Sequence, residues 1–239
     1  MSASGASQKA LARALLGRIL GFRDCPASTL DELVACGHLR ECLKGDCVVH
    51  RGQAFDHLGI VVTGTFESSL TRPDGHRHLV GLMQRGDIIG MVPLLDGLGH
   101  VNDLWVRAAG SILLIPGADV RRMHDAEPLL VRALERQLAF RTRLLYDRLT
   151  TDPALPLQTR VAILLQTLCT LYGLPRAAGT VLDMKLTQTD LADWLGVSRQ
   201  SINTAVKQLE VDGVIRLAYS AVEVLDNALL AERAKRTWA

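Results

Sequence analysis

The sequence predicts an α+β protein in which a roll of short strands, one long helix and a mainly helical C-terminal domain follow one another. Three features lead to this fold class. Between residues 38 and 116, short β-prone runs alternate with glycine. Residues 127–149 hold leucines at helical spacing, and residues 186–209 hold two apolar stripes at that spacing with a glycine between them.

The composition bounds the class of protein. With 239 residues and 48% hydrophobic side chains, the chain can build two domains with their own cores, and global disorder is excluded. No apolar run reaches the roughly 18 residues of a membrane span, because Arg13 and Arg18 interrupt the apolar stretch near the N-terminus. The start of the chain lacks a secretory cleavage pattern, and five cysteines, an odd number, fit a reducing compartment. We therefore expect a cytoplasmic protein without a membrane partner.

The first domain is expected to span residues 1–126. Its polar start predicts a frayed segment, and residues 11–20 and 29–36 predict two short helices. The strands that follow, with glycine turns at near-regular intervals, favour a jelly roll or β-roll. Pro73-Asp74-Gly75 predicts a hairpin turn between two of these strands.

Residues 127–150 predict one long helix that joins the two domains. Its stripe lies close to heptad spacing and consists of Leu130, Leu134, Leu138 and Leu145. A helix of this length beside a compact β-domain cannot bury its whole stripe alone, so we expect a homodimer. The alternative is a helix packed on its own β-domain, because Arg141 interrupts the seam. Two prolines within residues 151–156 stop the helix and predict a hinge.

Residues 157–239 are expected to form the second domain. Its first helix is predicted at residues 158–171, and a short strand at residues 181–185. In the stretch after it, Gly196 can take a positive φ between two helices that cross tightly, which predicts a helix-turn-helix. The inward-facing side chains of the two helices are Leu191, Ala192, Leu195, Ile202, Ala205, Val206 and Leu209, with Val197 as a buried plug between them. Two short alternating runs after Gly213 predict a wing; an ordinary two-helix corner is the alternative.

The outward face of the second helix is polar, and this predicts binding to DNA. Ser198 is expected to cap the helix, and the exposed side chains are Arg199, Gln200, Asn203, Thr204 and Lys207. Arginine pairs with guanine and asparagine or glutamine with adenine, while the start of the preceding helix, with Thr187 or Gln188, can hold a phosphate. From Leu155 onward, nine basic residues stand against eight acidic ones. Affinity must therefore depend on local placement and on dimerisation.

The order of these parts resembles the cyclic-AMP receptor protein and fumarate-nitrate regulator (CRP/FNR) family of bacterial transcription factors. The motifs that carry the resemblance are RGDIIG at 85–90, VSRQSIN at 197–203 and LEVDGVI at 209–215. The resemblance implies a cyclic-nucleotide-binding-like β-roll that senses an effector, a dimerisation helix and a winged helix-turn-helix. It also implies a homodimer on a near-palindromic DNA site, with RNA polymerase as a further partner. The implied base-reading side chains are Arg199, Gln200 and Thr204; many members have Glu and Arg in place of the last two.

The effector pocket departs from the pattern of the members that bind cyclic nucleotides. The resemblance places this pocket at Gly90, Met91, Val92, His100, Val101, Asn102 and Asp103. Met91 stands where those members have a ribose-binding Glu, and no alignment supplies the Arg of their phosphate-binding pair. Asp103 is expected to repel a phosphate, and Arg107 is a weak substitute. We therefore expect no cofactor, and either an unidentified effector other than cyclic AMP or constitutive activity.

The sequence was also compared with the patterns of metal or redox sensors and of enzymes. One alternative is a metal, haem or redox sensor built on a cluster of thiols and imidazoles, namely Cys36, His38, Cys42, Cys47 and His50. The spacing of this cluster matches neither a zinc knuckle nor the cysteine run of an iron-sulfur site. We therefore predict no metal site, and expect these cysteines to be small apolar residues that fill the core. Residues 48–116 show no paired carboxylates, nucleophile-base-orienter set or facial His/Glu cluster, so we do not expect an enzyme. A protein-binding module without DNA specificity stays open.

Overall fold

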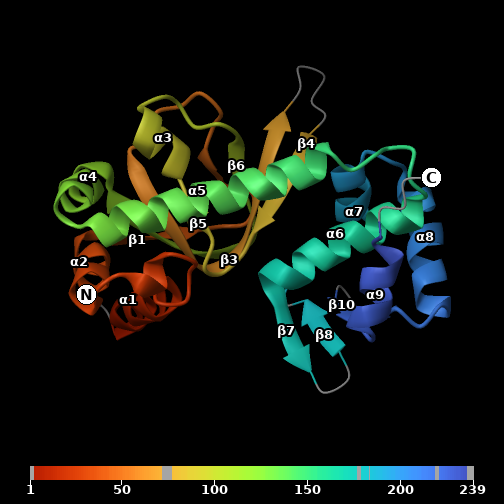
Figure 1. Ribbon diagram of the computed structural model, residues 1–239. Helices are drawn as coiled ribbons and strands as arrows, with labels where there is room; N and C mark the ends of the chain where they lie inside the picture. Colours follow the sequence, from red (N-terminus) through yellow and green to blue (C-terminus); the bar gives the residue numbers. More distant parts are fainter. Residues whose placement is uncertain (1–2, 72–76, 177–178, 183, 219–220, 236–239) are drawn as a thin grey trace. The chain divides into compact units, whose positions relative to one another are not determined.

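The computed structural model describes residues 3–71, 77–176, 179–182, 184–218 and 221–235. The chain divides into two compact units, Met1–Tyr146 and Asp147–Ala239 (Figure 1). Among the described residues, no helix combines the length and the apolar character that crossing a membrane requires.

The first unit is a six-stranded antiparallel roll with helices at its N-terminal and C-terminal ends. Its helical elements are α1 (Ala3–Leu16), η1 (Phe22–Asp24), α2 (Ala27–Cys36), α3 (Met91–Asp96), α4 (Gly117–Ala126) and α5 (Pro128–Leu149), whose last three residues belong to the second unit. Its strands are β1 (His38–Cys42), β2 (Cys47–Val49), β3 (His57–Thr71), β4 (Arg77–Met83), β5 (Ile88–Ile89) and β6 (Asp103–Pro116). The strand order is β1-β6-β3-β4, with β2 paired to β6 and β5 paired to β3.

The two long strands β3 and β6 form the centre of the roll. Their register shifts near Thr63, where Gly64 has φ 87° and lies against Gly110. A Cβ on Gly110 would lie 2.1 Å from the Thr63 carbonyl oxygen, so the two backbones approach more closely than any side chain permits. Irregularities of this kind allow long paired strands to bend. The predicted turn at Pro73-Asp74-Gly75 lies outside the described residues.

Alternation along these strands separates two apolar cores. On β6, Leu113 and Ile115 belong to the core beneath the helices, whereas Ile112 and Leu114 belong to the core inside the roll. The helix predicted at residues 11–20 is observed as α1, which begins at Ala3, within the polar start predicted to be frayed, and ends at Leu16, four residues before the expected end. Its C-terminal half packs on the core beneath the helices through Ala12 and Leu16, both fully buried.

The long helix α5 lies where the sequence predicts it, but its leucine stripe divides into two parts. Leu130 and Leu134 are buried in the core of their own domain, and Leu138 packs at the edge of that core. These leucines, expected in a dimer seam, are therefore covered without a partner chain. The segment that follows α1 covers this part of α5. It packs against the helix so tightly that a Cβ on Gly21 would lie 2.8 Å from Ala133 Cα. Leu145, in contrast, is 52% exposed.

The second unit combines a helix-turn-helix with a four-stranded antiparallel sheet. Its elements are α6 (Leu157–Tyr172), β7 (Gly173–Arg176), β8 (Gly179–Leu182), α7 (Gln188–Leu195), α8 (Arg199–Val211), β9 (Ile215–Ala218), β10 (Ala221–Val224) and α9 (Asn227–Arg233). The strand order is β7-β8-β10-β9, so the β7–β8 hairpin extends the predicted wing. β7 and α9 are not expected from the sequence, because β7 contains a proline and α9 is only two turns long.

Candidate functional site

The two helices of the helix-turn-helix are fixed by their caps. Thr187 opens α7 with a capping box: its hydroxyl oxygen accepts a hydrogen bond from the Asp190 amide at 3.2 Å, and its own amide donates to the Asp190 carboxylate at 2.8 Å. Gly196 closes α7 with φ 66°, as the sequence predicts. Ser198 then caps α8 by accepting a hydrogen bond from the Ser201 amide at 3.1 Å. These caps set the start of α8, which is the part of a recognition helix that meets base edges.

The inward faces of α7 and α8 pack as the spacing predicts. Ile202 and Val206 of α8 are fully buried, and Leu191 of α7 is 2% exposed. Leu195 and Val197 are only half-buried, so Val197 is less enclosed than a buried plug would be. Burial of this stripe leaves the opposite face of α8 in solvent.

A contact that the sequence analysis missed links the turn to α6. Arg160 of α6 donates a hydrogen bond from Nη2 to the carbonyl oxygen of Leu195 at 2.7 Å. This carbonyl belongs to the last residue of α7, where no helical partner remains for it. The guanidinium therefore holds the C-terminal end of α7 onto the first helix of its domain. No local spacing pattern indicates such a contact, because 35 residues separate the two partners.

The polar side chains on the outward face of α8 differ in how far they are exposed. Arg199, Gln200, Thr204 and Lys207 are exposed, and Asn203 is half-buried. The amide of Gln188 donates to Asn203 Oδ1 at 3.1 Å, and the Thr204 hydroxyl donates to the Gln200 carbonyl at 3.2 Å. Two of the side chains on the predicted DNA-binding face, Asn203 and Thr204, therefore have partners within their own domain.

The charges on this face are concentrated in two side chains. Among the described residues, Arg199 and Lys207 form no ion pair. Two other basic side chains of the unit are paired: Arg216 lies 3.2 Å from Glu223, and Arg233 lies 3.0 Å from Asp212. The near-neutral second unit thus still offers two uncompensated cations on the exposed face of α8.

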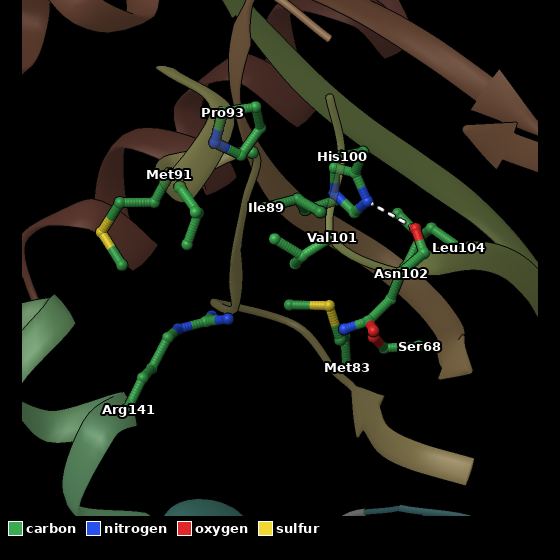
Figure 2. Close-up of a pocket in the computed structure, with 12 residues that line it drawn as sticks. Ser68, Met83, Ile89, Met91, Pro93, His100, Val101, Asn102, Leu104 and Arg141 are labelled. Carbon is green, nitrogen blue, oxygen red and sulfur yellow. Dashed lines mark hydrogen bonds between the residues drawn. The ribbon is translucent and has the colours of Figure 1, made fainter. Parts of the chain in front are cut away.

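The first unit contains a small pocket of about 80 Å³ between the roll, α3 and α5 (Figure 2). It is lined by Ser68, Met83, Ile89, Gly90, Met91, Val92, Pro93, His100, Val101, Asn102, Leu104 and Arg141. Gly90 has φ 77°, and a Cβ there would lie 2.3 Å from the His57 carbonyl oxygen, so the chain turns sharply between β5 and α3. The sequence analysis did not predict α3, which is a helix of six residues.

Asp103 is the exception among the residues predicted to form this pocket, since the other six line it. Its carboxylate accepts hydrogen bonds from the Arg51 amide at 2.9 Å and the Thr71 hydroxyl at 2.7 Å. Burial disfavours its charged form, but these hydrogen bonds outweigh burial, and the pKa of Asp103 is lowered. The predicted repulsion of a phosphate by Asp103 therefore needs correction, because this charge is directed away from the pocket. Arg107 lies outside the lining as well, 3.6 Å from Glu67.

Arg141 supplies the guanidinium that the sequence analysis did not find for this pocket. It reaches the lining from α5, and its Nη2 donates a hydrogen bond to the Ile88 carbonyl at 2.6 Å. Figure 2 shows its side chain entering from one side of the pocket, with the Asn102 amide on the other side. In the sequence, Arg141 interrupts an apolar stripe, and its place in the pocket depends on a contact across 53 residues.

His100 closes the apolar end of the pocket in a neutral form. It is 5% exposed, and its Nδ1 lies 2.6 Å from the Asn102 carbonyl oxygen, so Nδ1 carries the proton and donates it. Its ring meets Phe55 edge to face with centroids 5.5 Å apart. Burial lowers the pKa of His100, although the hydrogen bond and Asp103 act in the other direction.

This lowered pKa predicts a loss of stability in acid. As the pH falls below the ordinary histidine value of 6.5, the unfolded chain takes up a proton that folded His100 resists. The contribution is complete above that value and is lost as the pH falls toward the pKa of the folded state. We expect the difference in melting temperature between wild type and His100→Gln to shrink or reverse between about pH 7.5 and about pH 5.5. A difference that stays constant across this range would contradict the assignment.

The Cys/His cluster does not converge on one point. Cys36 packs at the edge of the core beneath the helices, whereas Cys42 is buried in the core inside the roll. Burial raises the pKa of the Cys42 thiol. Among the described residues, no three His, Cys, Asp or Glu side chains are grouped so that they could hold a metal ion.

One part of the cluster places a thiol, an imidazole and a carboxylate together. Cys47 Sγ and Asp103 Oδ1 both approach Nδ1 of His50, at 3.5 Å and 3.6 Å. A nucleophile activated by a histidine and an orienting acid needs both ring nitrogens. This arrangement uses one nitrogen for both neighbours and does not form such a relay.

Two family models match the chain on these two sites. The model of the cyclic nucleotide-binding domain matches residues 39–127, and the model of the Crp-like helix-turn-helix domain matches residues 159–233. The chain belongs to the CRP/FNR family of transcription regulators. This assignment confirms the family and the α+β fold class that the sequence motifs indicate.

Relatives of this CRP/FNR regulator include two proteins of Mycobacterium tuberculosis. A CRP-like cAMP-activated global transcriptional regulator is 26% identical over 196 residues, covering 80% of this chain and 86% of that protein. The HTH-type transcriptional regulator Cmr is 28% identical over 197 residues, covering 82% of this chain and 76% of that protein.

Solved structures share the fold of this CRP/FNR chain. FixK2 from Bradyrhizobium japonicum superposes with a TM-score of 0.73 at 18% identity, covering 84% of this chain and 99% of that chain. TTHA1359, a CRP/FNR-family regulator from Thermus thermophilus, gives a TM-score of 0.61 at 22% identity, covering 82% of this chain and 98% of that chain.

Proposed function

We propose that this CRP/FNR regulator is a homodimer that binds a near-palindromic DNA site through α8 and responds to an effector other than cyclic AMP. The observation that carries the DNA-binding part is the exposed face of α8, where Arg199, Gln200 and Lys207 project from a helix held by Ser198. Two such helices related by a two-fold axis can enter successive major grooves about 34 Å apart.

A dimer is supported by the balance of charge and by the exposed part of α5. A near-neutral domain with two uncompensated cations on the exposed face of α8 gives a weak electrostatic contribution to DNA binding, and pairing two domains multiplies it. Leu145 and Leu149 are 52% and 79% exposed on the last two turns of α5, which is the pattern of an unfilled seam. RNA polymerase is the further partner that the family suggests, and the cytoplasm is the compartment in which both partners are met.

The effector part rests on the lining of the pocket. Met91 lines the pocket at the position of the family's ribose-binding Glu, and the side chains at Val101 and Asn102 provide no guanidinium. Without those groups, the ribose hydroxyls and the cyclic phosphate would lose their usual hydrogen-bond partners, which is costly in a buried site. Isothermal titration of the purified protein with cyclic AMP is expected to show no binding in the micromolar range, and such binding would overturn this part.

Selection from random DNA duplexes with the full-length protein tests the DNA-binding part. We expect enrichment of a two-fold symmetric site, and footprints on both of its halves. Failure to enrich any symmetric site, with and without cell extract, would instead favour a protein-binding module. Enrichment that is equally strong without any added or co-purified ligand would indicate constitutive activity.

A further inference from the structure

We propose that the pocket of the first unit binds a small monocarboxylate with an apolar body, and that Arg141 pairs with its carboxylate. The inference rests on the proposed function in one respect, namely that the effector is not cyclic AMP. It names the chemical class that the lining selects.

The charge of the lining selects a monoanion. Arg141 is the basic side chain of the lining, and none of the lining residues that the structure describes is acidic. Among the described residues Arg141 forms no ion pair, since Glu67 lies beside Arg107 and Asp103 is directed toward Arg51 and Thr71. A partly buried guanidinium without a counter-ion favours one negative charge, whereas a second charge on the ligand would remain uncompensated.

The geometry of Arg141 suits a carboxylate. Its hydrogen bond to the Ile88 carbonyl at 2.6 Å uses one of five N–H donors and holds the guanidinium at the pocket wall. The remaining donors can form the paired hydrogen bonds that a planar carboxylate accepts. The Asn102 amide, on the opposite side of the pocket in Figure 2, can meet one polar atom at the far end of the ligand.

The rest of the lining selects an apolar body. Its walls come from Met83, Ile89, Met91, Pro93, Val101 and Leu104. His100 adds little polarity, because its Nδ1 proton is already donated to the Asn102 carbonyl and burial lowers its pKa. The lining side chains that can accept hydrogen bonds are Ser68, Asn102 and the unprotonated Nε2 of His100, and the six apolar walls outnumber them, so a branched or aromatic hydrocarbon body fits better than a sugar.

The position of Arg141 connects this pocket to the proposed dimer seam. It lies on α5 between the buried part of the helix, which contains Leu134, and the exposed part, which contains Leu145. A carboxylate bound by the remaining donors of Arg141 adds contacts to α5 beside the hydrogen bond to the Ile88 carbonyl. Differential binding of this kind is sufficient to shift the population of α5 conformations.

The experiment titrates the full-length protein with matched acids and amides. The probes are 3-methylbutanoate and phenylacetate, their neutral amides, and cyclic AMP, followed by calorimetry and by the shift of the melting temperature. We expect at least one acid to bind at least about tenfold more tightly than its amide, because only the acid pairs with Arg141.

Three variants assign the effect to the pocket. Arg141→Gln is expected to abolish the preference for the acid, and Met91→Glu to do the same by placing a carboxylate beside Arg141. Arg143→Gln, an exposed arginine on the same helix that does not line the pocket, should retain it. Circular dichroism and affinity for the selected duplex without ligand verify that each variant is folded.

Three outcomes would overturn the inference: equal binding of acids and amides, no binding of either acid, or a preference that survives Arg141→Gln. If the selected symmetric duplex is still bound in these cases, the proposed DNA-binding function stands and only the effector class fails. Binding of cyclic AMP through Arg141 would overturn the effector class together with the proposed exclusion of cyclic AMP.

Discussion

A chain carrying Leu145→Glu and Leu149→Glu is expected to be monomeric and to bind its selected DNA site at least about 100-fold more weakly than wild type. Both side chains are exposed in the isolated chain, at 52% and 79%, so their replacement should leave the fold of the monomer intact. In a paired seam, four like charges would meet across the interface. Losing the second subunit removes half of the DNA contacts and the effective concentration that links them.

Sedimentation or light scattering measures the oligomeric state, and a fluorescence titration measures the DNA affinity. Leu130→Ala is the matched control, because Leu130 is fully buried within its own domain. It should destabilise folding by about 2–5 kcal/mol and leave the association of the folded chain unchanged. A double glutamate variant that remains dimeric would show that this part of α5 is not the interface.

Arg199→Ala is expected to weaken binding to the selected site by about 1–3 kcal/mol per half-site and to relax base selectivity. Thr204 stands where many family members have Arg, and its hydroxyl is already hydrogen-bonded to the Gln200 carbonyl at 3.2 Å. Asn203 is held by Gln188. Arg199 is therefore the side chain on this face that can grip a guanine with two hydrogen bonds. Titrations of the selected duplex and of single-base variants, at fixed salt, measure both effects.

Lys207→Ala is the matched comparison on the same helix face. A lysine that contacts phosphate does not distinguish base sequences, so its removal should weaken binding to all duplexes similarly. It should also reduce the slope of log K against log salt concentration by about one per contact. Unchanged site-specific affinity of the Arg199 variant would contradict the proposed placement of α8. If the Lys207 variant lost affinity for the selected site more than for other duplexes, Lys207 would be a base-reading residue and not a phosphate contact.

Local patterns in the sequence determined the helix-turn-helix and the fold class. The spacing of Ile202 and Val206, the glycine at 196 and the cap at 198 are all short-range features, and each appears in the structure as predicted. Periodicity works over such distances because it reports which face of one element is covered. The same reasoning located α5 and the strand-rich region.

Only the tertiary structure decided which elements of the chain pack against each face of a helix or strand. The leucine stripe of α5 reads as one seam, yet the packing of Gly21 against Ala133 buries its first part within the domain and leaves Leu145 exposed. Arg141 reads as an interruption of that seam, yet its hydrogen bond to Ile88 makes it part of a pocket. Asp103 reads as a pocket residue, yet Arg51 and Thr71 direct it elsewhere. In each case the deciding contact joins residues far apart in the chain, and a local repeat carries no information about such contacts.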